Sequence, residues 1–143
     1  MIKKLAFVLM ALGCAAPASE APDPTDDIAA MLDASASAWN RRDFEAFTGD
    51  YANEPTTTFV SGGRVQHGAD WIRENYAPTF APDAVHDSLR FEDLEVRALG
   101  NAHALATARF ILFRGDSTTA EGPFTLILRK RNGSWRIIHD HTS

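Results

Sequence analysis

The chain has 143 residues, enough for one domain with a single hydrophobic core. Hydrophobic residues make up 45% of the sequence and charged residues 23%, which is ordinary for a soluble globular protein. The formal net charge of -5 at pH 7 argues against nucleic-acid binding and against electrostatic docking on anionic lipid, because both need a concentrated basic surface.

Residues 1–18 are predicted to be a signal peptide of the lipoprotein type. Two lysines and an apolar run are followed by Ala-Leu-Gly-Cys at residues 11–14, which resembles the signal of bacterial lipoproteins. Cleavage would then precede Cys14, which would carry the lipid, whereas Ala-Pro-Ala at residues 16–18 offers an ordinary signal-peptidase site. We therefore expect an exported protein, either a periplasmic or membrane-anchored lipoprotein or a secreted protein.

Residues 19–25 are predicted to be a flexible tether, because they are rich in proline and acidic residues and show no periodicity. The folded domain then covers residues 26–143. Since Cys14 is the only cysteine of the chain, we expect neither a disulfide nor a catalytic thiol in that domain. No membrane contact is expected apart from a lipid on Cys14.

The first part of the domain is predicted to be helical. Thr25 suits the N-cap of a helix, and acidic residues follow it in the first turn, where the helix dipole favours them. Residues of an amphipathic stripe, mostly hydrophobic, then recur at helical spacing on one face: Ile28, Met31, Leu32, Ser35 and Trp39. Asp43 can cap a second, shorter helix that ends near Tyr51.

A hairpin and a third helix come next. The segments 56–61 and 64–67 are rich in strand-forming residues, and Gly62-Gly63 between them can turn the chain. Gly68 opens a third helix that should end near Pro78, because proline cannot continue a helix.

After Pro82 the hydrophobic period changes from that of a helix to that of a strand, which predicts a long antiparallel meander. The apolar alternation changes parity between Phe91 and Leu94, and this predicts a bulge near Glu92-Asp93 that bends the sheet. Further strands are expected at 102–114, at 118–131 with a kink at Gly122-Pro123, and after the Asn132-Gly133 turn. Helices followed by a meander indicate an α+β fold.

The last strand ends on titratable residues. If it is regular, His139 and His141 share one face with Trp135, and Asp140 lies on the opposite face unless a bulge intervenes. The two histidines suit a hydrogen-bonded structural pair, a general base or, less well, a metal site. We predict no metal, because the chain offers no further ligand after His141.

Two segments carry a resemblance to a known family. Residues 42–47 (Arg-Asp-Phe-Glu-Ala-Phe) are similar to Gly-Asp-Phe-Glu-Ala-Tyr of the association domain of calcium/calmodulin-dependent protein kinase II, and residues 139–143 are similar to its His-Phe-His-Cys-Ser ending. With the order of elements, they make residues 26–143 resemble the SnoaL-like, nuclear transport factor 2-like superfamily, near the SgcJ/EcaC group.

The resemblance implies a cystatin-like cone, in which a strongly curved antiparallel sheet wraps around three N-terminal helices and leaves a pocket at its open end. It also implies a homodimer through the exposed face of the meander. Arg109 aligns with a pocket arginine of the kinase domain, whereas Thr125 stands where that domain has a second arginine. The superfamily hosts isomerases, cyclases, dehydratases, binding proteins and assembly modules, so it identifies no reaction.

Arg109 also stands out without the resemblance, because it sits within a strongly apolar strand. A charge there needs an acidic partner such as Glu95 or Asp140, a ligand anion or water, since an unpaired buried guanidinium is very costly. Tyr51 and Trp71 could line the pocket or pack in the core. The candidate ligand-binding residues are therefore Arg109, Tyr51, Thr125, His139, His141 and Trp71.

Three functions remain open on the sequence alone. The first is binding of a small polar or amphipathic molecule in the cone. The second is a cofactor-free acid/base enzyme of the isomerase, dehydratase or hydrolase type, with His139, Asp140 or His141 as the catalytic group. The third is a pure dimerisation module. The chain carries no dinucleotide fingerprint, phosphate loop or nucleophile motif, and we predict no cofactor.

Overall fold

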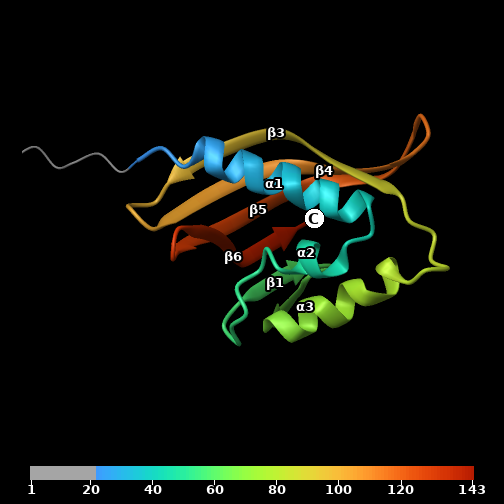
Figure 1. Ribbon diagram of the computed structural model, residues 1–143, viewed down its shortest axis with the longest axis horizontal. Helices are drawn as coiled ribbons and strands as arrows, with labels where there is room; N and C mark the ends of the chain where they lie inside the picture. The colour runs from blue at the N-terminus through green and yellow to red at the C-terminus, as the bar shows by residue number, and fades with distance from the viewer. Residues whose placement is uncertain (1–21) are drawn as a thin grey trace, which may run out of the picture.

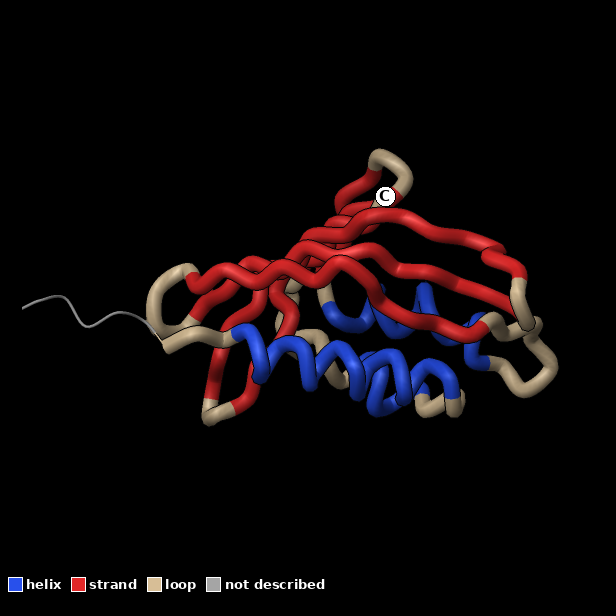
Figure 2. The backbone as a smooth tube through the Cα atoms, turned by 90° about the horizontal axis from the view of Figure 1, so that it is seen from above, coloured by secondary structure: helices blue, strands red, loops and turns tan. Residues whose placement is uncertain are grey.

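The computed structural model describes residues 22–143, so the predicted signal peptide, Cys14 and the start of the tether lie outside the described residues. The described chain forms a layer of helices packed on one face of a curved sheet, as Figures 1 and 2 show. The predicted α+β class and cone-like architecture are confirmed. Within this part of the chain, no helix is long and apolar enough to cross a membrane.

The helices are α1 (Thr25–Asn40), α2 (Phe44–Thr48), α3 (Ala69–Tyr76) and the 3-10 helix η1 (Ala77–Phe80). Asp43 caps α2 as predicted, because its carboxylate accepts a hydrogen bond from the Ala46 backbone N–H at 3.0 Å. At the start of α1, Thr25 is the first helical residue rather than the cap. The Asp23 carboxylate accepts from the Thr25 N–H at 3.0 Å and supports that first turn.

The strands are β1 (Thr58–Ser61), β2 (Arg64–His67), β3 (Ser88–Ala98), β4 (His103–Arg114), β5 (Ser117–Arg131) and β6 (Ser134–Thr142). Their order across the sheet is β2-β1-β6-β5-β4-β3, and β1 with β6 is the parallel pair among antiparallel neighbours. The predicted hairpin and meander are confirmed. Because β6 lies between β1 and β5, the titratable residues that end the chain lie in the middle of the sheet.

The predicted bulge in β3 is confirmed. The pairing of β3 with β4 shifts register between Glu92 and Glu95, and Asp93 adopts a left-handed backbone conformation with φ of 56°. After the bulge, Val96 pairs with Ala106 on the same buried face that Phe91 shares with Phe110 before it. The extra residue therefore keeps the apolar side chains of a bent strand on one side of the sheet.

No register shift accompanies the kink predicted at Gly122-Pro123; the pairing of β4 with β5 shifts further along, between Leu112 and Phe113. Gly122 has a steric role. A Cβ there would collide with the backbone oxygen of Ser143 and with the ring of Phe110. Ser143 is held in this place by its N–H, which donates to the Pro123 carbonyl at 3.1 Å. The glycine therefore lets the end of the chain lie against β5.

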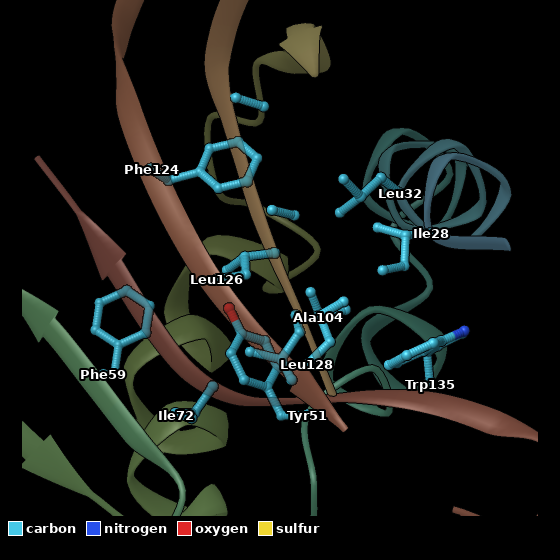
Figure 3. Close-up of a cluster of buried hydrophobic side chains, with 13 residues drawn as sticks. Ile28, Leu32, Tyr51, Phe59, Ile72, Ala104, Phe124, Leu126, Leu128 and Trp135 are labelled. Carbon is cyan, nitrogen blue, oxygen red and sulfur yellow. The ribbon is translucent and has the colours of Figure 1, made fainter. Parts of the chain in front are cut away.

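The core lies between the helices and the concave face of the sheet. Ile28 and Leu32 of α1 belong to one buried cluster with Leu126 and Leu128 of β5, and Figure 3 shows side chains of this cluster. Burying one such aliphatic side chain contributes roughly 1.5–3 kcal/mol. A second cluster, centred on Trp39, packs where α1, α2 and η1 meet the start of β3. The two clusters hold the helices on one face of the sheet and leave a cavity between them and the hairpin.

Candidate functional site

A cavity of about 490 Å³ opens between the helices and the concave face of the sheet. Its size falls within the range of sites that hold small organic molecules. Aromatic side chains from almost every element form its walls: Trp39, Phe59, Trp71, Phe91, Phe110 and Phe124. Such walls offer a large apolar contact area to a flat ring compound.

Asp140 of β6 faces this cavity and is only 5% exposed. The Tyr51 hydroxyl donates to its Oδ2 at 2.7 Å, and the Thr142 hydroxyl donates to its Oδ1 at 2.7 Å. Burial raises the pKa of Asp140, and the two hydrogen bonds and the nearby His139 and His141 only partly oppose that rise. A carboxyl group with a raised pKa inside an apolar cavity is suited to accept or release a proton.

Two tyrosines accompany Asp140. Burial, and then the negative charge of Asp140, raise the pKa of Tyr51, and the same two causes in the same order raise the pKa of Tyr76. Both phenols therefore stay protonated at neutral pH and remain hydrogen-bond donors. Figure 3 shows the Tyr51 hydroxyl pointing toward Leu126, the residue that pairs with Asp140 across the sheet.

The segment after α2 is fastened to β6, and this fixes Tyr51. The Ile137 N–H donates to the Asp50 carbonyl at 2.9 Å, and the Ala52 N–H donates to the Ile137 carbonyl at 2.8 Å. These backbone hydrogen bonds on either side of Tyr51 fix the position of its backbone relative to β6. The geometry of the pair of Tyr51 and Asp140 thus rests on rigid backbone rather than on a free loop.

The strand β6 contains a bulge, so the condition of a regular strand, on which the predicted faces of His139, Asp140 and His141 depended, does not hold. Leu128 pairs with Ile137, whereas the preceding Ile127 pairs with His139, which leaves Ile138 without a partner in β5. This extra residue reverses the alternation, so Ile137 and Asp140 both line the cavity. The structure thereby settles the alternative left open by the sequence: Asp140, and not the two histidines, faces the cavity.

His139 and His141 lie on the other face of the sheet. His139 Nδ1 is 2.6 Å from the Thr58 hydroxyl of the neighbouring strand, and His141 is exposed. In the described part of the chain, no group of three or more His, Cys, Asp or Glu side chains is placed to hold a metal ion.

The prediction that Arg109 points into the cavity is wrong. In β4, Ala108 and Phe110 face inward, so Arg109 faces outward and forms an ion pair with Glu121 of β5 at 3.4 Å. Its side chain is 41% exposed, so water solvates the guanidinium. The sequence was misleading here because the outer face of this strand is apolar too: Ile111 is buried although it shares that face.

Thr125 does not lie with the cavity residues either, since it pairs with Thr107 and His141 on the outer face. Trp71 and Tyr51 line the cavity, which is the first of the two alternatives, pocket or core, that the sequence left open for them. Of the six candidate ligand-binding residues, these two lie at the cavity; the other four are on the opposite face of the sheet.

Sequence reasoning missed several polar residues of the cavity, among them Thr142, Arg64 and Gln66. Thr142 shares a face with Asp140, and their spacing of two residues could have indicated this. Arg64 and Gln66 line the cavity from the hairpin. Alternation starting from Phe59, together with the Gly-Gly turn, places them on the inner face, so this signal was present in the sequence.

Asp50, next to Tyr51, is a partly buried acid beside the site. Its Oδ2 is buried and finds no hydrogen-bond partner among the described residues. Burial raises the pKa of Asp50, while a hydrogen bond from Ser35 and the charge of Arg136 oppose the rise. Unlike Asp140, it is not among the residues that line the cavity.

Comparison with known proteins agrees with the fold. Residues 28–143 match the model of the SnoaL-like domain. A search of curated proteins found no match. Among solved structures, the chain is similar to an NTF-2 like protein of unknown function from Shewanella oneidensis, with 31% identity, 84% of this chain and 98% of that chain covered, and a TM-score of 0.76.

Two more distant structures share the fold. One is a calcium/calmodulin dependent protein kinase II association domain from Xanthomonas campestris, with 19% identity, 82% and 84% coverage and a TM-score of 0.63. The other is a protein of the DUF3225 family from Pectobacterium atrosepticum, with 22% identity, 83% and 88% coverage and a TM-score of 0.64. By its sequence match and its fold, the chain belongs to the SnoaL-like family of nuclear transport factor 2-like proteins.

Proposed function

We propose that this protein binds a small amphipathic molecule with an apolar ring system in the cavity beside Asp140. The observation that carries the proposal is the combination of aromatic walls with one buried carboxyl group held by Tyr51 and Thr142. The walls supply contact area, and the few polar groups can orient a hydroxyl or carbonyl group of the ligand.

Native mass spectrometry of the protein purified from its own host tests this proposal. We expect a retained small molecule, and we expect Leu126→Trp, which fills the cavity beside Asp140, to release it. Ile127→Trp adds the same bulk on the outer face and is the matched control. A ligand that survives Leu126→Trp as well as it survives Ile127→Trp would place the binding site elsewhere.

A second candidate is a cofactor-free acid/base enzyme, which the raised pKa of Asp140 favours. In this hypothesis the Asp140 carboxylate accepts a proton from a carbon next to a carbonyl group. The electron pair moves to the carbonyl oxygen, and the phenol of Tyr76 donates a hydrogen bond to the resulting enolate. If the ketone carries a C=C bond next to that carbon, the enolate extends over it, and return of the proton to the far carbon of this bond would complete an isomerisation.

Deuterium exchange tests this second candidate without knowledge of the substrate. The α-hydrogens of 2-tetralone, a two-ring ketone, can be followed by NMR in D2O. If Asp140 is a base, the protein should accelerate the exchange, and Asp140→Asn should remove the acceleration while the fold persists. No acceleration by the wild type for a ketone that binds would leave binding alone as the function.

We also propose a homodimer formed through the outer face of the sheet. The support is that Leu105, Ile127 and Ile138 are only half-buried on or near this face, and the helices cover the opposite face. Light scattering at tens of micromolar protein should give twice the mass of the chain. A monomer under these conditions contradicts the proposal.

Export likewise remains a proposal, supported by the lysines, the apolar run and Cys14 at the start of the sequence. Labelling of cells with a palmitate analogue should mark the wild type and not Cys14→Ser. Equal labelling argues against the lipoprotein, and a cytosolic location of the wild type argues against export.

A further inference from the structure

The mouth of the cavity carries a positive charge. Arg64 and Asp140 are the two charged residues among the described residues that line the cavity. Asp140 is buried, whereas Arg64 is exposed on the hairpin of β1 and β2. Between residues 22 and 143, no acidic side chain forms an ion pair with Arg64. Its guanidinium is therefore available to a partner that comes from outside the chain.

The strand register places Arg64 on the inner face of the sheet. Arg64 pairs with Ser61, and Gln66 pairs with Phe59, so all four side chains lie on the side that faces the cavity. Phe59 pairs in turn with Asp140 of β6. Arg64 thus stands at the edge of the sheet, on the same concave surface as the buried acid.

The same register gives the distance between the two charges. Arg64 is two strands away from Asp140 across the sheet and about two residues further along. Neighbouring strands lie about 4.8 Å apart and residues rise about 3.3 Å along a strand, so the two backbones are roughly 12 Å apart. The aromatic side chains of Phe59 and Trp71, whose rings lie 5.7 Å from each other, belong to the wall of the same cavity.

We propose that Arg64 binds an anionic group of the ligand, so that the ligand class is an apolar ring compound with a carboxylate or sulfonate. This proposal rests on the proposed binding function. A guanidinium prefers such planar or branched oxyanions because it can donate two hydrogen bonds to them. Asp140 disfavours a second negative charge in the buried part of the cavity, so the ligand enters with its rings inward and its anion at the mouth.

Two fluorescent probes test this proposal. Anilinonaphthalene-8-sulfonate and N-phenyl-1-naphthylamine share the same ring system, and the second lacks the sulfonate. We expect Arg64→Gln to weaken binding of the sulfonate probe about fivefold to tenfold and to leave binding of the neutral probe unchanged. Arg97→Gln removes an exposed arginine from β3, away from the cavity, and should change neither affinity.

The outcomes distinguish a failure of the proposed role of Arg64 from a failure of the proposed binding function. If neither probe binds the wild type, the proposed binding function fails and the role of Arg64 falls with it. If both probes bind and Arg64→Gln has the affinities of the wild type, only the role of Arg64 is overturned. An equal loss for both probes also overturns it, because the hairpin would then act through packing. A loss for the sulfonate probe alone, absent in Arg97→Gln and reduced by salt, supports it.

Discussion

The two faces of the sheet place charged side chains in different surroundings. On the concave face, Asp140 is almost fully buried, accepts two hydrogen bonds and has a raised pKa. On the outer face, Arg109 is half-exposed and pairs with Glu121 across neighbouring strands. Burial shifts the pKa of the Asp140 carboxyl upward, whereas Arg109 and Glu121 form an ordinary surface ion pair. A charge in an apolar stretch of sequence is therefore not by itself a sign of a site; the face on which it lies decides.

The largest expected effect concerns packing on the two faces. Leu128→Ala on the concave face should lower the free energy of unfolding by about 2–5 kcal/mol, because the side chain is fully buried between α1 and the sheet. Ile127→Ala on the outer face should cost less than about 1.5 kcal/mol. Urea unfolding measures both. Equal losses would contradict the difference in burial between the two faces. A loss for Ile127→Ala that grows on dilution would indicate that the outer face is a dimer interface.

The next effect concerns the hydrogen bond to the buried acid. Tyr51→Phe should lower stability at neutral pH by about 1.5–3 kcal/mol, because it removes a donor to a buried carboxylate. It should also raise the pKa of Asp140 further. Tyr76→Phe removes a phenol that donates no direct hydrogen bond to Asp140 within the described residues, and it should cost less. A cost for Tyr51→Phe below that of Tyr76→Phe would show that this hydrogen bond contributes little.

The third effect concerns pH. The pKa of Asp140 is raised in the folded state, so between its unfolded and folded pKa values the folded protein binds more protons than the unfolded one. The free energy of unfolding should therefore fall as the pH rises through the pKa of Asp140 in the folded protein. Below the pKa that Asp140 has in the unfolded chain, Asp140 should no longer destabilise the fold. Asp50 contributes with the same sign.

Asp140→Asn isolates the contribution of this residue to the pH dependence. Measured by thermal unfolding from pH 3.5 to 8, the advantage of the variant over the wild type should grow with pH and then level off. Asp50→Asn provides the comparison for a partly buried acid. A constant difference between Asp140→Asn and the wild type over this range would mean that Asp140 titrates as it does in water.

The smallest expected effect concerns the outer ion pair. Arg109→Gln should change the free energy of unfolding by less than about 1 kcal/mol, because both partners of the pair are exposed to water. Glu121→Gln should change it by a similar amount. A loss of about 3 kcal/mol or more in either variant would indicate a buried, desolvated pair and would remove the contrast with the concave face.

Much of the fold follows from local signals in the sequence. The turn glycines, the Asp43 cap and the change of hydrophobic period after Pro82 all lead to elements that the structure contains. The bulge in β3 was predictable because a polar pair, Glu92-Asp93, separates two apolar runs of opposite parity. In each of these cases the residue type changes along the sequence where a helix, strand or bulge begins.

The site was harder to predict, because no change in residue type marks the bulge in β6 that turns Asp140 inward. The bulge in β6 falls at Ile138, between an apolar residue and a polar one, and both registers look acceptable in one dimension. The pairing with β5 selects one of them and thereby turns Asp140 inward. Likewise, Arg109 lies between Ala108 and Phe110 in a strand whose two faces are both apolar, so the sequence alone does not tell which face is outside.

Whether Asp140 is the buried acid of a ligand-binding cavity can be measured by titrating its side-chain carboxyl carbon by NMR, with and without N-phenyl-1-naphthylamine. Asp140→Asn identifies the signal. We expect a pKa above the ordinary value near 3.9 in the free protein and a further change when the probe enters the cavity, because the probe displaces water from the carboxyl group. An ordinary pKa that does not respond to a bound probe would contradict the assignment of the concave face as the functional site.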